Sequence, residues 1–191
     1  YGQLDKASEK VIISPHRKKA PIIKALGKKV SVELIDSLLP NTTYTFDFTD
    51  AIVDNNEKNA IDGFTFAFST GDVIDSLVIS GLLLNAEDQE PMKGIMVGLH
   101  SDLADSAFLT LPFKRTSVTN DRGQFWIRNV AEGTYRLFAL QDMNRNYMFD
   151  QPTEAIAFFD TLITPSFEPA IRQDTVWIDS LTIDTIKEVH Y

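Results

Sequence analysis

The chain has 191 residues, a net charge of −9 and no cysteine. Without cysteine it cannot form disulfides, thiolate metal sites or a cysteine nucleophile. Its acidic balance argues against a nucleic-acid partner, which would require an exposed basic face. No apolar run approaches the roughly 18 residues that a membrane-spanning helix needs. The chain begins with Tyr1 rather than Met, so we interpret it as a mature or trimmed segment from which an upstream export signal could have been removed.

The charge is spread unevenly along the chain. Residues 1–71 carry nine acidic and nine basic side chains, and residues 72–191 carry the remaining eighteen acidic and nine basic ones. The main basic run, residues 16–19, contains one histidine, one arginine and two lysines, with no aromatic residue among them. A short run of this kind is typical of a solvated turn, and we interpret it as one.

Alternation of large and small side chains predicts strands in the first seventy residues. Gly27 predicts a hairpin turn, and the polar stretch 54–63 predicts a long loop. Three sets of residues place their large members on one face, as in a half-buried strand: Val30, Val32 and Leu34; Tyr44, Phe46 and Phe48; Phe64, Phe66 and Phe68.

Residues 39–71 resemble the bacterial Ig-like domain of S-layer and surface proteins. The resemblance rests on Leu39-Pro40, Thr43-Tyr44, the polar loop, the three phenylalanines and Thr70-Gly71. It implies a sandwich with a tyrosine corner, in which the Tyr44 hydroxyl bonds to nearby backbone; a plain core aromatic is the alternative. Such domains open with one or two further strands, which we expect this chain to lack. The resulting uncovered edge would invite pairing with another chain.

A second group of short apolar runs starts near Leu77. Residues 120–123 predict a hairpin turn, after which Phe125 and Ile127 are predicted to point inward. The pattern over residues 77–150 resembles the carboxypeptidase-regulatory-like domain, a transthyretin-like sandwich. The two domains in this order are similar to Ig-like surface lipoproteins of Bacteroidetes. That resemblance implies an exported protein with a lipid anchor upstream.

The predicted fold class is all-β, with two consecutive β-sandwiches. The composition changes within residues 69–76, where we place a domain boundary. Residues 1–71 are predicted to form the N-terminally incomplete Ig-like sandwich and residues 72–160 the transthyretin-like one. An extended C-terminal segment, residues 161–191, has two prolines and many Asp-Thr or Asp-Ser steps, and we expect its strands to lean on another part of the structure.

A possible metal site lies in the polar stretch that follows the second group of strands. Four residues stand at positions 1, 3, 5 and 9 of a calcium-type loop: Asp142, Asn144, Asn146 and Asp150. Tyr147 occupies the position where a turn glycine is expected, and Glu154 comes one residue too late for the usual bidentate ligand. The alternatives are therefore a weak calcium site and a polar turn closed by Asx bonds.

Aromatic residues suggest a different kind of site. Trp126 is opposite in phase to its two neighbours, so it is predicted to face away from the core. Phe138 and Leu140 likewise leave the face of Tyr135, which gives this strand two apolar faces. The second face would be covered by the neighbouring domain, the C-terminal segment or a ligand. A glycan or peptide site would use these residues: Trp126, Trp177, Tyr147 and Phe149.

No catalytic motif accompanies these features. His16, His100 and His190 are scattered, and the chain contains no G-x-S-x-G, H-E-x-x-H or Walker sequence. We therefore predict a non-catalytic scaffold or adhesion module, which the resemblance to surface lipoproteins implies is exported to the cell surface or the periplasmic face of the outer membrane. The alternatives are a glycan- or peptide-binding module and a calcium-rigidified linker.

The predicted partner is a protein or glycan at the cell envelope. Nucleic acid is not expected, and contact with the membrane is expected only through an upstream lipid anchor. An edge-strand dimer is a further prediction from the incomplete sandwich.

Overall fold

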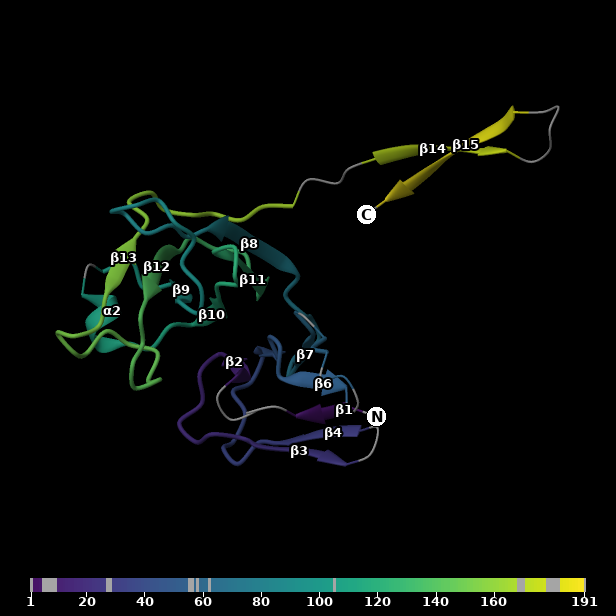
Figure 1. Cartoon of the computed structure of the whole chain (residues 1–191). Coiled ribbons are helices and arrows are strands. Elements are labelled where there is room, and N and C mark those ends of the chain that lie inside the picture. Colours follow the sequence, from purple (N-terminus) through teal and green to yellow (C-terminus); the bar gives the residue numbers. More distant parts are fainter. Residues whose placement is uncertain are drawn as a thin grey trace.

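The chain is built almost entirely of β-strands, as the alternating pattern predicts (Figure 1). The computed structural model describes residues 2–4, 10–26, 29–54, 57, 59–61, 63–104, 106–167, 171–177 and 183–190. For residues 2, 3, 26, 171–177 and 183–190 it describes the backbone alone. None of the helices in the described part of the chain has the length and apolar character needed to cross a bilayer.

Among the described strands, the first seven pair only with one another, and we call residues 2–69 the first module. They form three antiparallel groups: β1–β6, β2–β5–β7 and β3–β4. Their bounds are β1 Gly2–Leu4, β2 Ile12–Ser14, β3 Ile22–Leu26, β4 Lys29–Glu33, β5 Thr43–Asp47, β6 Ile52–Asp54 and β7 Thr65–Ser69. A short strand therefore precedes β2, where the sequence predicted none: in β1, Gly2 lies opposite Asp54 of β6. The predicted turn at Gly27 lies outside the described residues, between β3 and β4.

The core of the first module forms around β5. Tyr44, Phe46 and Phe48 are buried, as their alternation predicts, and they pack with Ile13 of β2. The prediction is less accurate for β7, because Phe64 is 45% exposed and Phe66 is 54% exposed. The reason is topological: β7 is the outer strand of its sheet, so its aromatic face is covered from one side only.

The polar face of β5 is also buried, which the alternating pattern did not predict. Thr43 and Thr45 lie on the face opposite the core and are nevertheless buried. Thr45 donates from Oγ1 to Oδ1 of Asn129 at 3.1 Å, so residues of the second half of the chain cover this face. A strand expected to be half-buried is thus covered on both sides.

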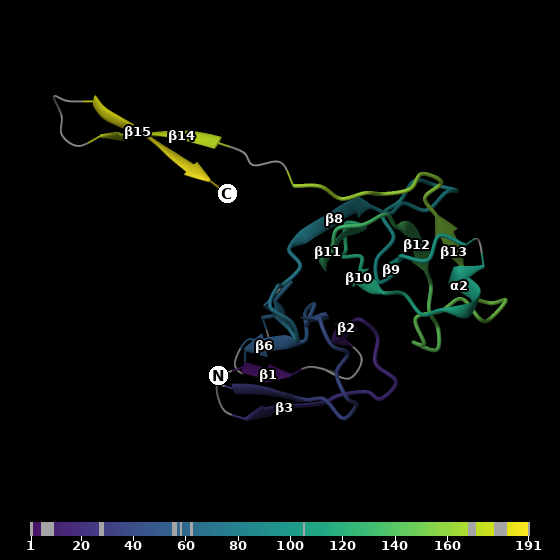
Figure 2. The same ribbon diagram turned by 180° about the vertical axis from the view of Figure 1, so that it is seen from behind.

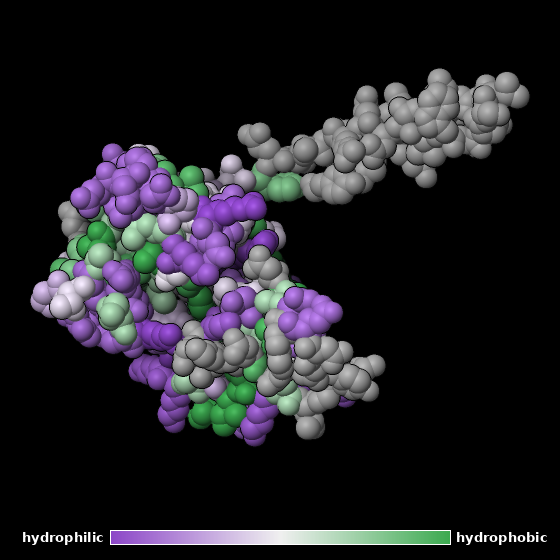
Figure 3. All heavy atoms as spheres, in the orientation of Figure 1, coloured by the Kyte–Doolittle hydropathy of each residue, from purple (hydrophilic) through white to green (hydrophobic). Residues whose placement is uncertain are grey.

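The second module, residues 77–163, is a two-layer sandwich that lies beside the first (Figures 1 and 2). One layer pairs β8 with β11, and the other has the order β10–β9–β12–β13. The bounds are β8 Leu77–Leu82, β9 Met96–His100, α2 Ala107–Thr110, β10 Arg115–Val118, β11 Gln124–Val130, β12 Arg136–Leu140 and β13 Ile156–Phe158. Hydrophilic side chains predominate on the face of this module seen in Figure 3.

The core between the two layers contains the residues that the sequence placed there. Phe125 and Ile127 of β11 point inward, against Tyr135 and Ala139. The turn at residues 120–123 is tight, with Gly123 N donating to Asn120 O at 2.9 Å. It is not a hairpin, however, because β10 pairs with β9 whereas β11 pairs with β8. The turn instead carries the chain from one layer to the other.

The second apolar face of β12 is covered from within the same module. Phe138 and Leu140 are buried in a cluster with Met96 and Phe113, and Phe108 of α2 packs against it. Gly98 allows this cover, because a Cβ there would lie 2.2 Å from Cγ of Phe113. The expectation that another domain, the C-terminal segment or a ligand covers this face is therefore wrong. The segment between β9 and β10 does so instead.

The C-terminal segment contains an antiparallel pair, β14 (Ile171–Trp177) with β15 (Ile183–His190). Ahead of it, the backbone of Ile163 exchanges two hydrogen bonds with Tyr135, at 2.8 and 2.9 Å. The second layer thus continues to residue 163, slightly beyond the predicted end of the domain at residue 160. Figure 1 shows the β14–β15 hairpin beyond the second module.

Candidate functional site

Arg115 is the centre of a polar network where the two modules meet. Its side chain lies at the start of β10, and the residue is only 5% exposed. It donates to the backbone oxygen of Ser14 at 3.2 Å and to Oδ2 of Asp75 at 3.4 Å. Burial lowers the pKa of Arg115, and the Asp75 carboxylate opposes that shift. We call residues 70–76, between the two modules, the linker. A buried guanidinium with partners in both the first module and the linker favours one arrangement of the two modules.

Two further contacts complete the network. Ser14 Oγ accepts from the backbone N–H of Thr116 at 3.0 Å and also lies 3.0 Å from Thr116 Oγ1. Asn129 donates from Nδ2 to the backbone oxygen of Asp75 at 2.8 Å. Asn129 has a φ of +56° at an irregularity in β11, a conformation that asparagine tolerates better than most residues. The linker residue Asp75 is therefore held from both sides, because its N–H donates to Oγ1 of Thr43 at 3.0 Å.

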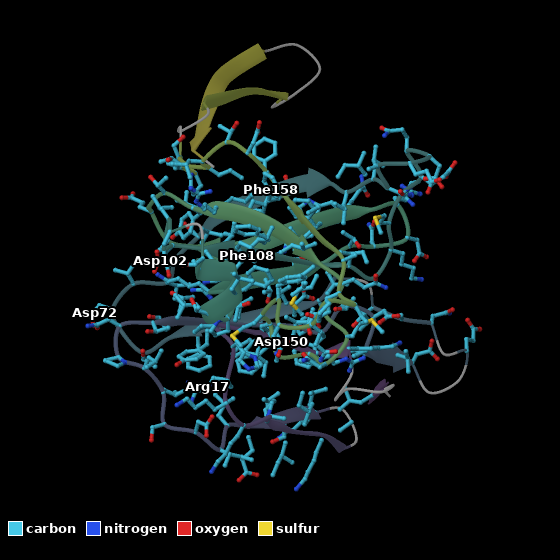
Figure 4. The ribbon with its side chains drawn as sticks, turned by 90° about the vertical axis from the view of Figure 1, so that its left-hand side faces the viewer. Arg17, Asp72, Asp102, Phe108, Asp150 and Phe158 are labelled. Atoms are coloured by element: carbon cyan, nitrogen blue, oxygen red, sulfur yellow. The ribbon has the colours of Figure 1, made fainter. Side chains whose placement is uncertain are left out.

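The structure brings the four predicted calcium ligands together in one loop. Asp142 accepts backbone N–H groups from Arg145 at 2.6 Å and Tyr147 at 2.8 Å. The two carboxylate oxygens of Asp150 accept from the side-chain amides of Asn144 at 3.0 Å and Asn146 at 2.6 Å. Figure 4 shows this loop, marked by Asp150, on the side of the second module that faces Arg17.

Glu154 is a member of this loop that the sequence reasoning set aside. It is buried, and its carboxylate accepts backbone N–H groups from Met143, Asp150 and Gln151 at 3.2–3.3 Å. Glu154 follows a proline-containing turn directly in the sequence, and this position could have indicated that its carboxylate accepts backbone N–H groups of the loop. In the described part of the chain, no three His, Asp or Glu side chains gather closely enough to hold a metal ion. A cation in this loop would therefore need the amide oxygens of Asn144 and Asn146 as well.

Tyr147 closes the loop against the first module. Its φ is +66°, so a tyrosine takes the strained conformation for which glycine was expected. One contact with each module offsets that strain. In the second module its backbone oxygen accepts from Phe113 N at 2.9 Å, and in the first module the His16 ring centroid lies 4.1 Å from its own. Burial raises the pKa of Tyr147, and burial also lowers the pKa of His16.

A wide cleft of about 1310 Å³ lies between the modules, next to these contacts. Residues 10–13, 16–21 and 49–50 line it from the first module, and residues 118–122 and 145–147 are among those that line it from the second. Trp126, on the outer face of β11, also lines it and is 40% exposed. The cleft therefore combines an accessible indole with walls of mixed polar and apolar character.

The cleft is rich in cationic side chains. Seven lysine and arginine residues line it against three aspartates: Lys10, Arg17, Lys18, Lys19, Lys93, Arg122 and Arg145, against Asp50, Asp121 and Asp142. Lys10 pairs with Asp50 at 3.1 Å, and Lys93 pairs with Asp121. This group could not be predicted from the sequence, because its members come from separate stretches of the chain, residues 10–19, 93 and 122–145.

The four predicted ligand-binding aromatics do not form one site. Trp126 and Tyr147 line the cleft. Phe149 packs towards Phe108, with ring centroids 6.0 Å apart, beside the outer apolar cluster of the second module. Trp177 lies in β14, and its side chain is outside the described residues.

Comparison with known proteins finds a similarity for the first part of the chain alone. No curated protein and no solved structure matches the chain. Bacterial Ig-like domains are typically found in surface or extracellular proteins, are generally non-catalytic, and suggest a structural or interaction module. Residues 3–70 match the family model described as the bacterial Ig-like domain, in agreement with the resemblance carried by residues 39–71.

Proposed function

We propose that this chain is a non-catalytic, exported scaffold or adhesion module that holds two β-sandwiches in a fixed arrangement at the cell envelope. The buried network around Arg115 carries the proposal, because it joins the first module, the linker and the second module through directional bonds. The Ig-like first module supports a structural or interaction role. A rigid pair of sandwiches can present a binding surface at a defined distance from an anchor.

Small-angle X-ray scattering of Arg115→Met tests this proposal. The variant keeps much of the side-chain volume but loses the bonds to Ser14 and Asp75. We expect the wild type to scatter as one compact arrangement and the variant to show a larger radius of gyration. Arg128→Met is the control, because Arg128 is exposed on β11 and, within the described part of the chain, makes no ion pair with the first module. Identical scattering from all three proteins would show that the Arg115 network does not hold the arrangement, and an extended wild type would refute the rigid arrangement itself.

The proposed location is the cell surface or the periplasmic face of the outer membrane. The order of an Ig-like module followed by a transthyretin-like one supports this, since it resembles Ig-like surface lipoproteins of Bacteroidetes. A lipid anchor upstream would then be the membrane contact. Fractionation of cells that express the full-length precursor, followed by protease treatment of intact cells, distinguishes surface display from a periplasmic location.

A glycan- or peptide-binding role is a second candidate, which the exposure of Trp126 in the cleft favours. If the chain has this binding role, its partner at the cell envelope is a carbohydrate or a protein, and nucleic acid is not a partner. An edge-strand dimer remains a proposal for the first module, where Phe66 of the outer strand β7 and Phe64 directly before that strand are exposed. Sedimentation velocity over a hundredfold concentration range tests for such a dimer.

Calcium binding by residues 142–154 is a third proposal, in which the ion rigidifies the loop that touches the first module. It is supported by the position of the Asp142, Asp150 and buried Glu154 carboxylates in one loop with Asn144 and Asn146, whose amide oxygens now accept the backbone N–H groups of Asn146 and Met148 and would have to turn to an ion. These groups supply the hard oxygen ligands that calcium prefers.

A further inference from the structure

The cleft between the modules is cationic in a protein whose net charge is −9. Its lining carries seven lysine and arginine side chains and three aspartates, so its formal charge is +4 (7 − 3). A concave surface with one sign of charge focuses the electrostatic potential and attracts ligands of the opposite sign. The remaining surface is acidic and repels such ligands, which directs them to the cleft.

Several of these cations are available to a ligand. Lys18, Lys19, Arg122 and Arg145 are exposed. Among the described residues none of the four makes an ion pair. Arginine offers planar donors that match carboxylate or sulfate groups. The cleft therefore has charge left over after its own pairs, Lys10–Asp50 and Lys93–Asp121, are counted.

The other lining groups suit a carbohydrate. The indole of Trp126 offers an aromatic face for the C–H groups of a sugar ring. Asn120, Gln124 and Asn146 lie in the same lining; each amide nitrogen carries two N–H groups, so those of Asn120 and Asn146 keep one donor for a hydroxyl group beside their bonds to Gln124 and Asp150. The volume of about 1310 Å³ exceeds the roughly 300–1,000 Å³ of a typical small-molecule pocket, so a ligand of several units fits.

A peptide is less well suited to this cleft. An extended peptide binds by adding a strand to a free sheet edge. The edge strands at the junction, β2 and β10, face each other, and Ser14 Oγ already accepts the N–H of Thr116. We infer that the cleft binds an acidic oligosaccharide, with a sugar ring on Trp126 and its carboxylate or sulfate groups near Arg122, Arg145 and Lys18. This inference rests on the proposed role as an envelope interaction module.

Isothermal titration calorimetry of the full chain with two acidic probes tests the inference. The probes are a galacturonic acid hexamer, which carries carboxylates, and a heparin-derived hexasaccharide, which carries sulfates as well. Maltohexaose is the neutral control and hexaglutamate is the acidic peptide control. We expect at least one acidic hexasaccharide to bind at least tenfold more tightly than both controls, and to weaken as sodium chloride rises from 50 to 500 mM.

Variants locate the site. Trp126→Ala and the double variant Arg122→Gln/Arg145→Gln should each weaken binding at least about fivefold. Phe158→Ala and Arg128→Gln are matched controls: Phe158 is 73% exposed, Arg128 is exposed, and neither lines the cleft. All five positions have exposed side chains, and circular dichroism of each of the four variants confirms that it folds.

Several results would overturn the inference. They are no binding of either acidic probe at millimolar concentration, equal binding of maltohexaose, tighter binding of hexaglutamate, or binding unchanged in both cleft variants. None of these results depends on the scattering of Arg115→Met. If the molecule is rigid but binds neither probe, oligosaccharide binding is refuted and the scaffold role stands. If the molecule is flexible but binds a probe, the rigid scaffold is refuted and oligosaccharide binding stands.

Discussion

Tyr44 shows how a single hydroxyl can fix the entrance to a strand. Its side chain is fully buried, and its oxygen accepts from the backbone N–H of Leu39 at 2.8 Å and from Nη1 of Arg17 at 3.1 Å. The predicted bond from the phenol to nearby backbone is therefore present, and the simpler alternative of a plain core aromatic does not apply. The sequence could suggest this because the proline and the tyrosine are close in the chain. It could not reveal Arg17, which approaches from another segment.

Tyr44→Phe should destabilise the protein by roughly 1–3 kcal/mol, because it leaves two donors without their acceptor. Urea denaturation followed by tryptophan fluorescence measures the change. Tyr135→Phe is the control, since it removes a single bond, from the Tyr135 hydroxyl to the backbone oxygen of Ala131. A larger loss for Tyr135→Phe than for Tyr44→Phe would contradict this account of the corner.

His100 gives the stability of the protein a dependence on pH. The imidazole is buried between Phe113 and Phe138, and among the described residues its Nε2 has no hydrogen-bond partner. Burial lowers the pKa of His100 from its ordinary value of 6.5, and Asp102 opposes the shift. Below pH 6.5 the unfolded chain therefore binds a proton that the folded chain resists. The contribution of His100 to stability is complete above that pH and is lost as the pH falls towards the folded-state pKa.

We expect His100→Gln to flatten the fall in unfolding free energy between pH 7.5 and pH 5.0. Urea denaturation at four pH values in this range measures the slope for the variant and the wild type. Carboxylates contribute equally to both proteins, so the difference between the slopes isolates the histidine. Parallel slopes would show that His100 titrates alike in the folded and unfolded states.

At the scale of elements, the loop after β12 is ordered by its own polar side chains. Asp142 and Asp150 bond to groups within the loop, while Tyr147 anchors it to Phe113 and His16. The sequence predicted which four side chains would meet, because their spacing is local. It did not predict that Glu154 would join them or that the loop would touch the first module.

Millimolar calcium should raise the melting temperature if the ion binds this loop. A tenfold excess of calcium over its dissociation constant adds about 1.4 kcal/mol to the stability of the folded state. Differential scanning calorimetry in 5 mM calcium and in EDTA measures the shift, which Asp150→Ala should abolish. Asp88→Ala is the control, because Asp88 lies in an exposed turn elsewhere. Equal melting temperatures in calcium and EDTA would leave the loop as a polar turn.

At the scale of the whole molecule, the linker between the modules combines exposed and fixed residues. Val73 is 74% exposed and Ile74 is 51% exposed, whereas the adjacent Asp75 is bonded to both modules. The predicted domain boundary falls in this stretch. Its accessibility to a protease should therefore depend on the Arg115 network.

Thermolysin, which cuts before aliphatic residues, should cleave the wild type slowly between residues 71 and 77 and leave two resistant fragments. Arg115→Met should be cut severalfold faster at the same position, because Asp75 loses its buried partner. Mass spectrometry of the digestion products identifies the cut. A first cut inside either module, or no fragments at all from the variant, would argue against two separable domains.

Beyond the resemblance of residues 39–71 to an Ig-like domain, the sequence by itself determined that this protein is all-β and that Phe125 and Ile127 lie inside. These features depend on period-two alternation and on turn residues, which are local properties of the chain. Only the tertiary structure decided what covers the polar face of β5, what covers the outer face of β12, and where the basic residues gather. Those outcomes depend on contacts between segments many tens of residues apart. A side chain such as Lys18 or Arg122 carries no local signal of the neighbour that folding brings to it.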